Sequence, residues 1–175
     1  MSAIRIYNIS DNIIFRKTKE EFGGLSNMAP GFSIYVNEVI IPTSEHLYQA
    51  CRFPENPQLQ WEIINEKSPM RAKWIGRAHI KESRKDWELI QFKVMQWALE
   101  LKLSQNWSNF SAPLRATDGK NIVESTPSQK FGGCAERGSV RRRKRAREAA
   151  KAYQRKICYP KCSQHMCASI KRSGF

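Results

Sequence analysis

A short polar segment around residue 45 carries the side chains best suited to chemistry. After Pro42-Thr43-Ser44 come Glu45, Tyr48, Gln49 and Arg52. A hydroxyl side chain in this place caps the first N–H groups of a helix, so we expect a helix to begin here with Glu45 in its first turn. Spacings of three and four residues place the four side chains on one side of that helix. The helix dipole favours an ionised carboxylate, which suits Glu45 to act as a base or to stabilise a cation. A solvated N-terminal glutamate is the commoner use of such a residue.

Residues 42–53 also resemble a known family signature. They read Pro-Thr-Ser-Glu-His-Leu-Tyr-Gln-Ala-Cys-Arg-Phe and are similar to the signature of the YbiA-like (NADAR) family of N-glycosidases, which usually has lysine where Arg52 stands. The resemblance covers residues 12–133. Other pieces follow in the family's order: Phe22 with Leu25-Ser26-Asn27, Ser68-Pro69-Met70 with Gly76-Arg77, and Lys85-Asp86-Trp87-Glu88 before Val94-Met95 and Lys102.

The resemblance implies hydrolysis of an N-glycosidic bond between ribose and a base. The implied substrates are phosphoribosylaminopyrimidine intermediates of riboflavin biosynthesis, with ADP-ribose attached to guanine in nucleic acid or nucleotides as the alternative. Such cleavage passes through an oxocarbenium-like state, which a carboxylate near the anomeric carbon stabilises. The resemblance gives Glu45 this catalytic role. It implies no cofactor, neither a metal nor a redox group.

Trp87 is the predicted stacking residue. It corresponds to the tryptophan of the family's Trp-Glu pair, and a Trp face can stack a flat heterocycle for about 1–3 kcal/mol. Its spacing to Ile90 and Val94 also fits the apolar stripe of a helix, so core packing is the alternative use of this side chain. With the resemblance, stacking on the leaving base is the preferred interpretation.

Four further residues complete the predicted substrate-binding set. Ser26 and Asn27 match the family's loop, where they are expected either to bond ribose or phosphate or to close the loop through local backbone bonds. Tyr48 and Arg52 lie on the same side of the helix as Glu45. Arg52 keeps a positive charge for a phosphate but excludes covalent amine chemistry at that position.

The family's second signature is altered in this chain. Residues 129–133 read Gln-Lys-Phe-Gly-Gly, where the family has an aspartate, any residue, an aromatic, a tryptophan and a glycine. The change at Gln129 removes a candidate partner for proton transfer or ribose binding, a loss that can cost orders of magnitude in rate. The competing prediction is therefore a degenerate, noncatalytic binder of nucleotides or nucleic acid.

The elements that must position these residues are mostly helical. We expect a strand over 12–16, a loop over 22–31 and a hairpin whose strands end at Val36 and begin again at Val39. Helices are expected from Glu45, over 58–67, from Pro69 and over 86–103, the last one capped by Asp86. A segment over 107–116, a turn and a short extended piece over 121–124 follow. The predicted fold class is α+β, a mainly helical single domain around a small β-sheet.

Charge divides the chain into two parts. Residues 137–175 hold 13 of the 30 Lys and Arg but only Glu148 among the 16 acidic residues, so the preceding part, with 17 basic and 15 acidic residues, is nearly neutral. We therefore expect the enzymatic domain to cover 1–136 and a basic segment to cover 137–175. Within it, residues 137–156 are expected to allow nonspecific contact with nucleic acid. The spacing of Cys158, Cys162, His165 and Cys167 is too cramped to favour a zinc site.

Composition points to a folded domain away from the membrane. Hydrophobic residues make up 41% and charged residues 26% of the 175 residues, which excludes the disordered class. The first thirty residues hold no apolar core typical of a secretion signal, and no run approaches the ~18 apolar residues of a membrane span. The five cysteines are an odd number, which argues against a disulfide framework. These features predict a cytoplasmic protein with reduced thiols and no membrane partner.

Overall fold

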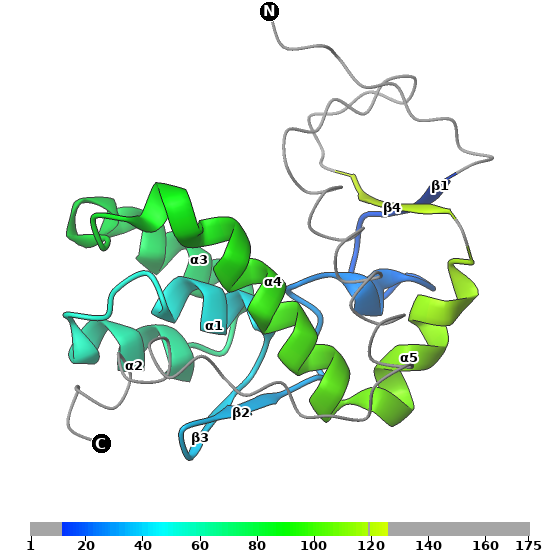
Figure 1. Ribbon diagram of the computed structural model, residues 1–175, viewed down its shortest axis with the longest axis horizontal. Helices are drawn as coiled ribbons and strands as arrows, with labels where there is room; N and C mark the ends of the chain where they lie inside the picture. Colours follow the sequence, from blue (N-terminus) through cyan, green and yellow to red (C-terminus); the bar gives the residue numbers. More distant parts are fainter. Residues whose placement is uncertain (1–11, 119, 126–175) are drawn as a thin grey trace, which may run out of the picture.

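The fold is built from short strands at its edges and helices through its middle. The computed structural model describes residues 12–118 and 120–125, and the predicted strands and helices are present within them (Figure 1). This arrangement confirms the α+β class, with the small sheet split into two separate pairs of strands in the described part. In chain order the elements are β1 (Asn12–Phe15), η2 (Gly23–Leu25), β2 (Ile34–Val36), β3 (Val39–Ile41), α1 (Ser44–Ala50), α2 (Pro57–Asn65), α3 (Pro69–Ala78), η3 (Ile80–Glu82), α4 (Trp87–Gln105), α5 (Trp107–Ala116) and β4 (Asn121–Glu124).

The helix starts are specified by local side chains. The hydroxyl of Thr43 accepts a hydrogen bond from the backbone N–H of His46 and so caps α1. Asn56 caps α2 in the same way, and Ser68 caps α3, each followed by a proline in the first turn. The predicted starts of α1 and α3 are confirmed. The second predicted helix begins one residue earlier than expected and ends at Asn65 instead of 67.

The long helix α4 starts after Asp86, as predicted, but without the predicted side-chain cap. Asp86 precedes the helix, but its side chain makes no capping hydrogen bond. Its two carboxylate oxygens instead accept from Nε and Nη2 of Arg84 at 2.6 and 3.1 Å. The guanidinium of Arg84 also holds the pKa of Asp86 below its usual range. The predicted cap was wrong because a paired charge-assisted contact competes well with a single bond to a backbone N–H.

The hairpin turn is formed by two residues in the left-handed region. Asn37 and Glu38 have φ values of 49° and 66°, and β2 pairs with β3 in antiparallel register on either side of them. Glycine adopts this conformation without steric cost, and Asn-Gly is the preferred pair in such turns. We expect Glu38→Gly to raise the unfolding free energy by about 0.5–1 kcal/mol in urea titrations, whereas the same change at exposed Glu62 in α2 should lower it.

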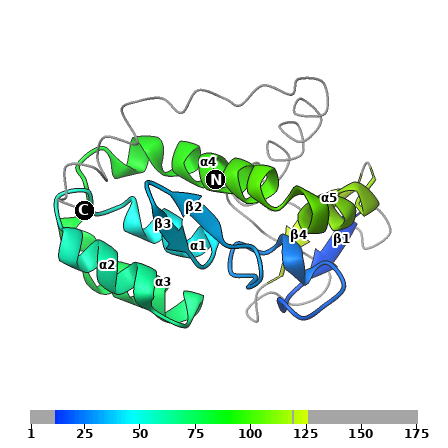
Figure 2. The ribbon, with the colours of Figure 1, turned by 90° about the horizontal axis from the view of Figure 1, so that it is seen from below.

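Helix α1 lies at the centre of the helical part. It packs against α2, α3 and α4, and the hairpin meets it through β3 (Figure 2). Leu47, Tyr48 and Ala50 each enter a different apolar cluster, the first with the hairpin, the second with α4 and the third with α2 and α3. All seven residues of α1 are buried in consequence. The segment that carries the predicted catalytic residue is therefore enclosed on several sides.

The other end of the fold is closed by strands far apart in sequence. β1 pairs in parallel with β4, and α5 lies beside them, at the opposite end from α2 and α3 (Figure 1). Their apolar side chains surround Leu25 of η2, so the loop before α1 is packed against this end. The cluster consists of Phe15, Leu25, Leu103, Phe110, Leu114 and Ile122.

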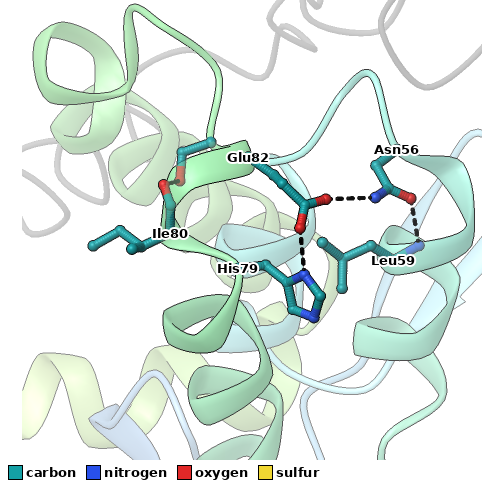
Figure 3. Close-up of polar contacts among 6 residues, drawn as sticks. Asn56, Leu59, His79, Ile80 and Glu82 are labelled. Atoms are coloured by element: carbon teal, nitrogen blue, oxygen red, sulfur yellow. Dashed lines mark hydrogen bonds and ion pairs between the residues drawn. The ribbon is translucent and has the colours of Figure 1, made fainter.

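A polar bridge joins the start of α2 to the end of α3. The carboxylate of Glu82 accepts from Asn56 at 2.9 Å and contacts Nδ1 of His79 at 2.6 Å (Figure 3). Asn56 in turn accepts from the backbone N–H of Leu59. The hydrogen bonds from His79 and Asn56 hold the pKa of Glu82 below its usual range. Both helices are thereby fixed where they flank α1.

Candidate functional site

Glu45 is a buried carboxylate. Only 5% of its surface is exposed. Its backbone N–H donates to the carbonyl of Asn27 at 3.1 Å, and its Oε1 accepts from Nε2 of Gln49 at 2.8 Å. The first-turn position was predicted correctly, and the solvated use of such a residue does not apply here. A carboxylate that is removed from water and held by a hydrogen bond is suited to stabilise positive charge that develops beside it.

The loop before α1 is anchored by a buried lysine. Lys102 of α4 is 1% exposed, and its Nζ donates to the carbonyls of Gly24 and Ser26 at 2.7 and 3.0 Å. The same ammonium lies 4.5 and 4.4 Å from the ring centroids of Phe32 and Phe110. Carbonyl oxygens and aromatic faces both favour a cation. Sequence reasoning gave Lys102 no functional role, although a lysine within the apolar stripe of α4 was a usable signal.

Ser26 and Asn27 have different roles in this loop. The Ser26 hydroxyl donates to Oε1 of Glu124 at 2.6 Å and accepts from the N–H of Met28 at 3.2 Å. Asn27 reaches the site through its carbonyl, which binds the N–H of Glu45. Its side-chain Oδ1 is buried and has no hydrogen-bond partner within the described part of the chain. Ser26 therefore closes the loop, one of its two predicted uses, through a partner on β4 that the sequence did not reveal.

The side chains of Tyr48, Arg52 and Trp87 form a second group, in contact with one another. The Tyr48 and Trp87 rings are tilted by 57° with centroids 4.9 Å apart, and the Arg52 guanidinium lies 5.5 Å from the Trp87 centroid. Nε of Arg52 donates to the hydroxyl of Ser83 at 2.7 Å. Trp87 is only 4% exposed, so it packs against the other two side chains. Its stacking on a substrate base stays a prediction.

His46 is a neutral histidine that braces α1. It is fully buried, with Nε2 2.9 Å from the carbonyl of Glu66 and Nδ1 2.8 Å from the hydroxyl of Thr43. A carbonyl can only accept, so Nε2 carries the hydrogen and Nδ1 accepts from Thr43. Burial lowers the pKa of His46 from its ordinary 6.5. This side chain fixes the helix and is not an acid–base group of the site.

The burial of His46 predicts a pH dependence of stability. Below its ordinary pKa of 6.5 the unfolded chain binds a proton that the folded chain does not, so the unfolding free energy falls as the pH drops below 6.5 toward the lowered pKa of the folded state. The slope in this window should approach about 1.4 kcal/mol per pH unit. His46→Gln should flatten it in urea titrations at several pH values. His79→Gln, at a partly exposed histidine, is the control, and an equal flattening there would contradict the assignment.

The structure therefore brings part of the predicted set together. Asn27 contacts Glu45 directly, whereas Ser26 lies in the same loop and Trp87 joins Tyr48 and Arg52. Residues 129–133, the basic segment and the cysteines beyond Cys51 lie outside the described residues. Within the described ranges, His, Cys, Asp and Glu side chains form no group of three that could hold a metal ion, and no helix is long and apolar enough to cross a membrane.

Comparison with known proteins identifies relatives over most of the chain. The N-glycosidase YbiA of Escherichia coli is 36% identical over 143 residues, which cover 81% of this chain and 88% of that protein. An N-glycosidase of Nostoc punctiforme is 29% identical over 124 residues, covering 70% of this chain and 78% of the relative. A riboflavin biosynthesis protein of Vibrio vulnificus is 30% identical over 132 residues, 73% of this chain but 35% of the relative.

The fold is shared with a solved relative. The NMR structure of E. coli YbiA superposes with a TM-score of 0.68 at 30% identity, covering 87% of this chain and 92% of that one. Residues 14–156 match the NADAR domain, a range that extends past the domain boundary predicted at residue 136. That boundary lies outside the described residues and stays a prediction. On sequence and structure together, the chain belongs to the NADAR domain family.

Proposed function

We propose that this protein is an N-glycosidase that hydrolyses the bond between ribose and a base, with Glu45 as its catalytic carboxylate. The observation that carries the proposal is the environment of Glu45, a residue 5% exposed whose carboxylate accepts from Gln49 and whose backbone N–H donates to the loop carbonyl of Asn27. The names of the E. coli and Nostoc relatives, both N-glycosidases, support the same reaction class.

The proposed reaction separates positive from negative charge at one bond. As the C1′–N bond breaks, its electron pair leaves with the base and C1′ gains oxocarbenium character, which the Glu45 anion stabilises. Water then adds to C1′ and loses a proton, and the departing base gains one. Overall, one water is consumed and the ribosyl hydroxyl and free base are formed. No redox or metal cofactor is part of this proposal.

Two buried oxygens near Glu45 support a sugar site beside it. Asn27 Oδ1 and Ser44 Oγ are buried and have no hydrogen-bond partner among the described residues. Buried polar atoms in native proteins normally have a partner, so these two oxygens, on residues that adjoin Glu45 through the backbone, fit a ligand that brings hydroxyl groups. We assign Asn27, predicted from sequence, and Ser44, not predicted, to the ribose hydroxyls. Ser26 acts by fixing the loop through Glu124.

The aromatic and cationic group fits the remaining parts of such a substrate. Arg52 carries a positive charge suited to a phosphate, and its orientation is set by Ser83 and by the Trp87 ring. Tyr48 contributes an aromatic edge beside it, with its hydroxyl 3.4 Å from Oε1 of Gln91. We propose that Trp87 supports these two side chains and that Tyr48 and Arg52 meet the substrate.

The proposed substrates are phosphoribosylaminopyrimidine intermediates of riboflavin biosynthesis. The riboflavin biosynthesis protein of V. vulnificus supports this choice over ADP-ribosylated guanine, the second candidate. The altered residues 129–133 favour a third candidate, a noncatalytic binder. A cytoplasmic location and nonspecific nucleic-acid contact through residues 137–156 stay predictions.

The test is release of sugar and base by the purified full-length chain. We expect ribose 5-phosphate from the phosphoribosylaminopyrimidines in amounts equal to the released base, and none from protein carrying Glu45→Gln. Release of ADP-ribose from ADP-ribosylated guanine alone would select the second substrate. Binding of either compound by calorimetry without product would select the noncatalytic binder and overturn the proposed reaction.

A further inference from the structure

Gln49 holds the carboxylate of Glu45 from one helical turn away. Its Nε2 donates to Oε1 of Glu45 at 2.8 Å, and its side chain is only 3% exposed. An ionised carboxylate offers no donor, so the amide nitrogen must face Glu45 and the amide oxygen must face away. The orientation of the Gln49 amide is thus set by its role toward the carboxylate.

The oxygen of that amide occupies the place of a missing side chain on α3. A Cβ built on Gly76 would lie 2.3 Å from Oε1 and 3.2 Å from Cδ of Gln49. These contacts are too short for any residue other than glycine unless Gln49 moves. Gly76 is buried in the last turn of α3, where alanine would be the better helix former, so this glycine lowers the local stability of the helix. The same Oε1 has no hydrogen-bond partner among the described residues, so no polar contact would resist its displacement.

We propose that Gln49 and Gly76 are positioning residues of the glycosidase site, Gln49 by fixing the Glu45 carboxylate and Gly76 by leaving room for the Gln49 amide. The inference deepens the proposed function and rests on it. Helix α3 thereby acts on the carboxylate through Gln49, since α1 and α3 pack against each other and Gly76 faces the Gln49 amide. A side chain at 76 would push the amide away from Glu45 and remove the Gln49 hydrogen bond from the carboxylate.

Three variants and one control test the pair. Gln49→Met removes the donor at nearly constant volume, Gly76→Ala displaces the donor, and Gln49→Ala makes space for a side chain at 76. Gln60→Met is the matched control, because Gln60 is equally buried and donates from Nε2 at 3.0 Å, but to the carbonyl of Ala50. The control loses a buried amide hydrogen bond of the same kind without touching Glu45.

We expect Gln49→Met and Gly76→Ala each to lower kcat by about 10- to 100-fold, since misplacing a reacting group by an ångström has effects of this size. KM should change by less than about twofold, because neither residue is assigned to substrate. Losing the N–H donor also disfavours the anion, so the acid limb of the kcat/KM profile should move to higher pH. Gln60→Met should leave that limb in place, and an equal shift there would overturn the proposal.

A double-mutant cycle separates action through Gln49 from a direct effect of position 76. In the Gln49→Ala background, Gly76→Ala should cause less than a further twofold loss. The full loss in that background would overturn the proposed path. Carboxyl NMR titration of Glu45 needs no substrate. It can be carried out on the four proteins of the cycle and on Gln49→Met, and it tests the two positioning residues even if neither candidate substrate is turned over. If no substrate is turned over but the Glu45 titration shows the expected coupling between positions 49 and 76, the proposed function alone is wrong. If the Glu45 titration is unchanged in Gln49→Met, the positioning role is wrong.

Discussion

Glu45→Gln is expected to lower kcat/KM by about a thousandfold while the protein stays folded. The loss follows because a neutral amide cannot stabilise the oxocarbenium-like state or accept a proton from water, and removal of one such electrostatic contact typically costs about 10²–10³ in rate. Stability should be kept because the amide has the same shape, and its oxygen can still accept from Nε2 of Gln49. Steady-state kinetics and urea titration of the same preparation measure both effects.

A matched substitution distinguishes the site from a general effect of charge. Glu62 is exposed on α2, and Glu62→Gln should leave kcat/KM within about twofold of the wild type. Retention of more than a tenth of the activity by Glu45→Gln would remove Glu45 from the chemistry. A comparable loss in Glu62→Gln would show instead that the assay responds to net charge.

Lys102→Ala is expected to lower the unfolding free energy by about 3–5 kcal/mol, the largest stability effect that we predict. The change opens a cavity beside Phe32 and Phe110, removes the ammonium donor of the Gly24 carbonyl, and leaves the Ser26 carbonyl with one donor fewer beside the N–H of Ala29. Because these carbonyls belong to the loop that binds the N–H of Glu45, the folded fraction should also lose activity. Urea denaturation followed by Trp fluorescence gives the free energy.

The control for this loss lies on the same helix. Lys93 is exposed on α4, and Lys93→Ala should change the unfolding free energy by less than about 0.5 kcal/mol. A loss below about 1 kcal/mol in Lys102→Ala would mean that water replaces the ammonium at the two carbonyls, and the loop would then be held by its apolar residues instead.

Elements with local signals could be predicted from the sequence. The hairpin turn and the proline-marked helix starts depend on residues within one turn of each other, so Thr43 and Ser68 were sufficient to place α1 and α3. The same capping hydroxyl was sufficient to place Glu45 in a first turn. The cap at Asp86 was wrong because Arg84, also nearby in sequence, offered its carboxylate a stronger partner.

The burial of the site depends on contacts that no local pattern contains. Whether Glu45 is solvated or enclosed is decided by the helices and the loop that pack around α1. Ser26 meets Glu124 across 98 residues of sequence, and spacing alone could not reveal that bond. The position of Trp87 fits both the apolar stripe of α4 and the Trp-Glu pair of the family. Only the positions of Tyr48 and Arg52 show how the indole is packed.

The pairing of β1 with β4 sets the order in which the site can be completed during synthesis. Helices α1 to α4 lie within residues 44–105, and α1 packs against each of the other three, so they can assemble while the chain is still emerging from the ribosome. The pairing of β1 with β4 must wait until residues 121–124 have been made, and the same strand brings Glu124 to Ser26. Ribosome-bound chains that end before residue 121 should therefore carry Glu45 on a formed helix, with Lys102 available to its loop, yet lack the bond from Ser26 to Glu124 that closes this loop.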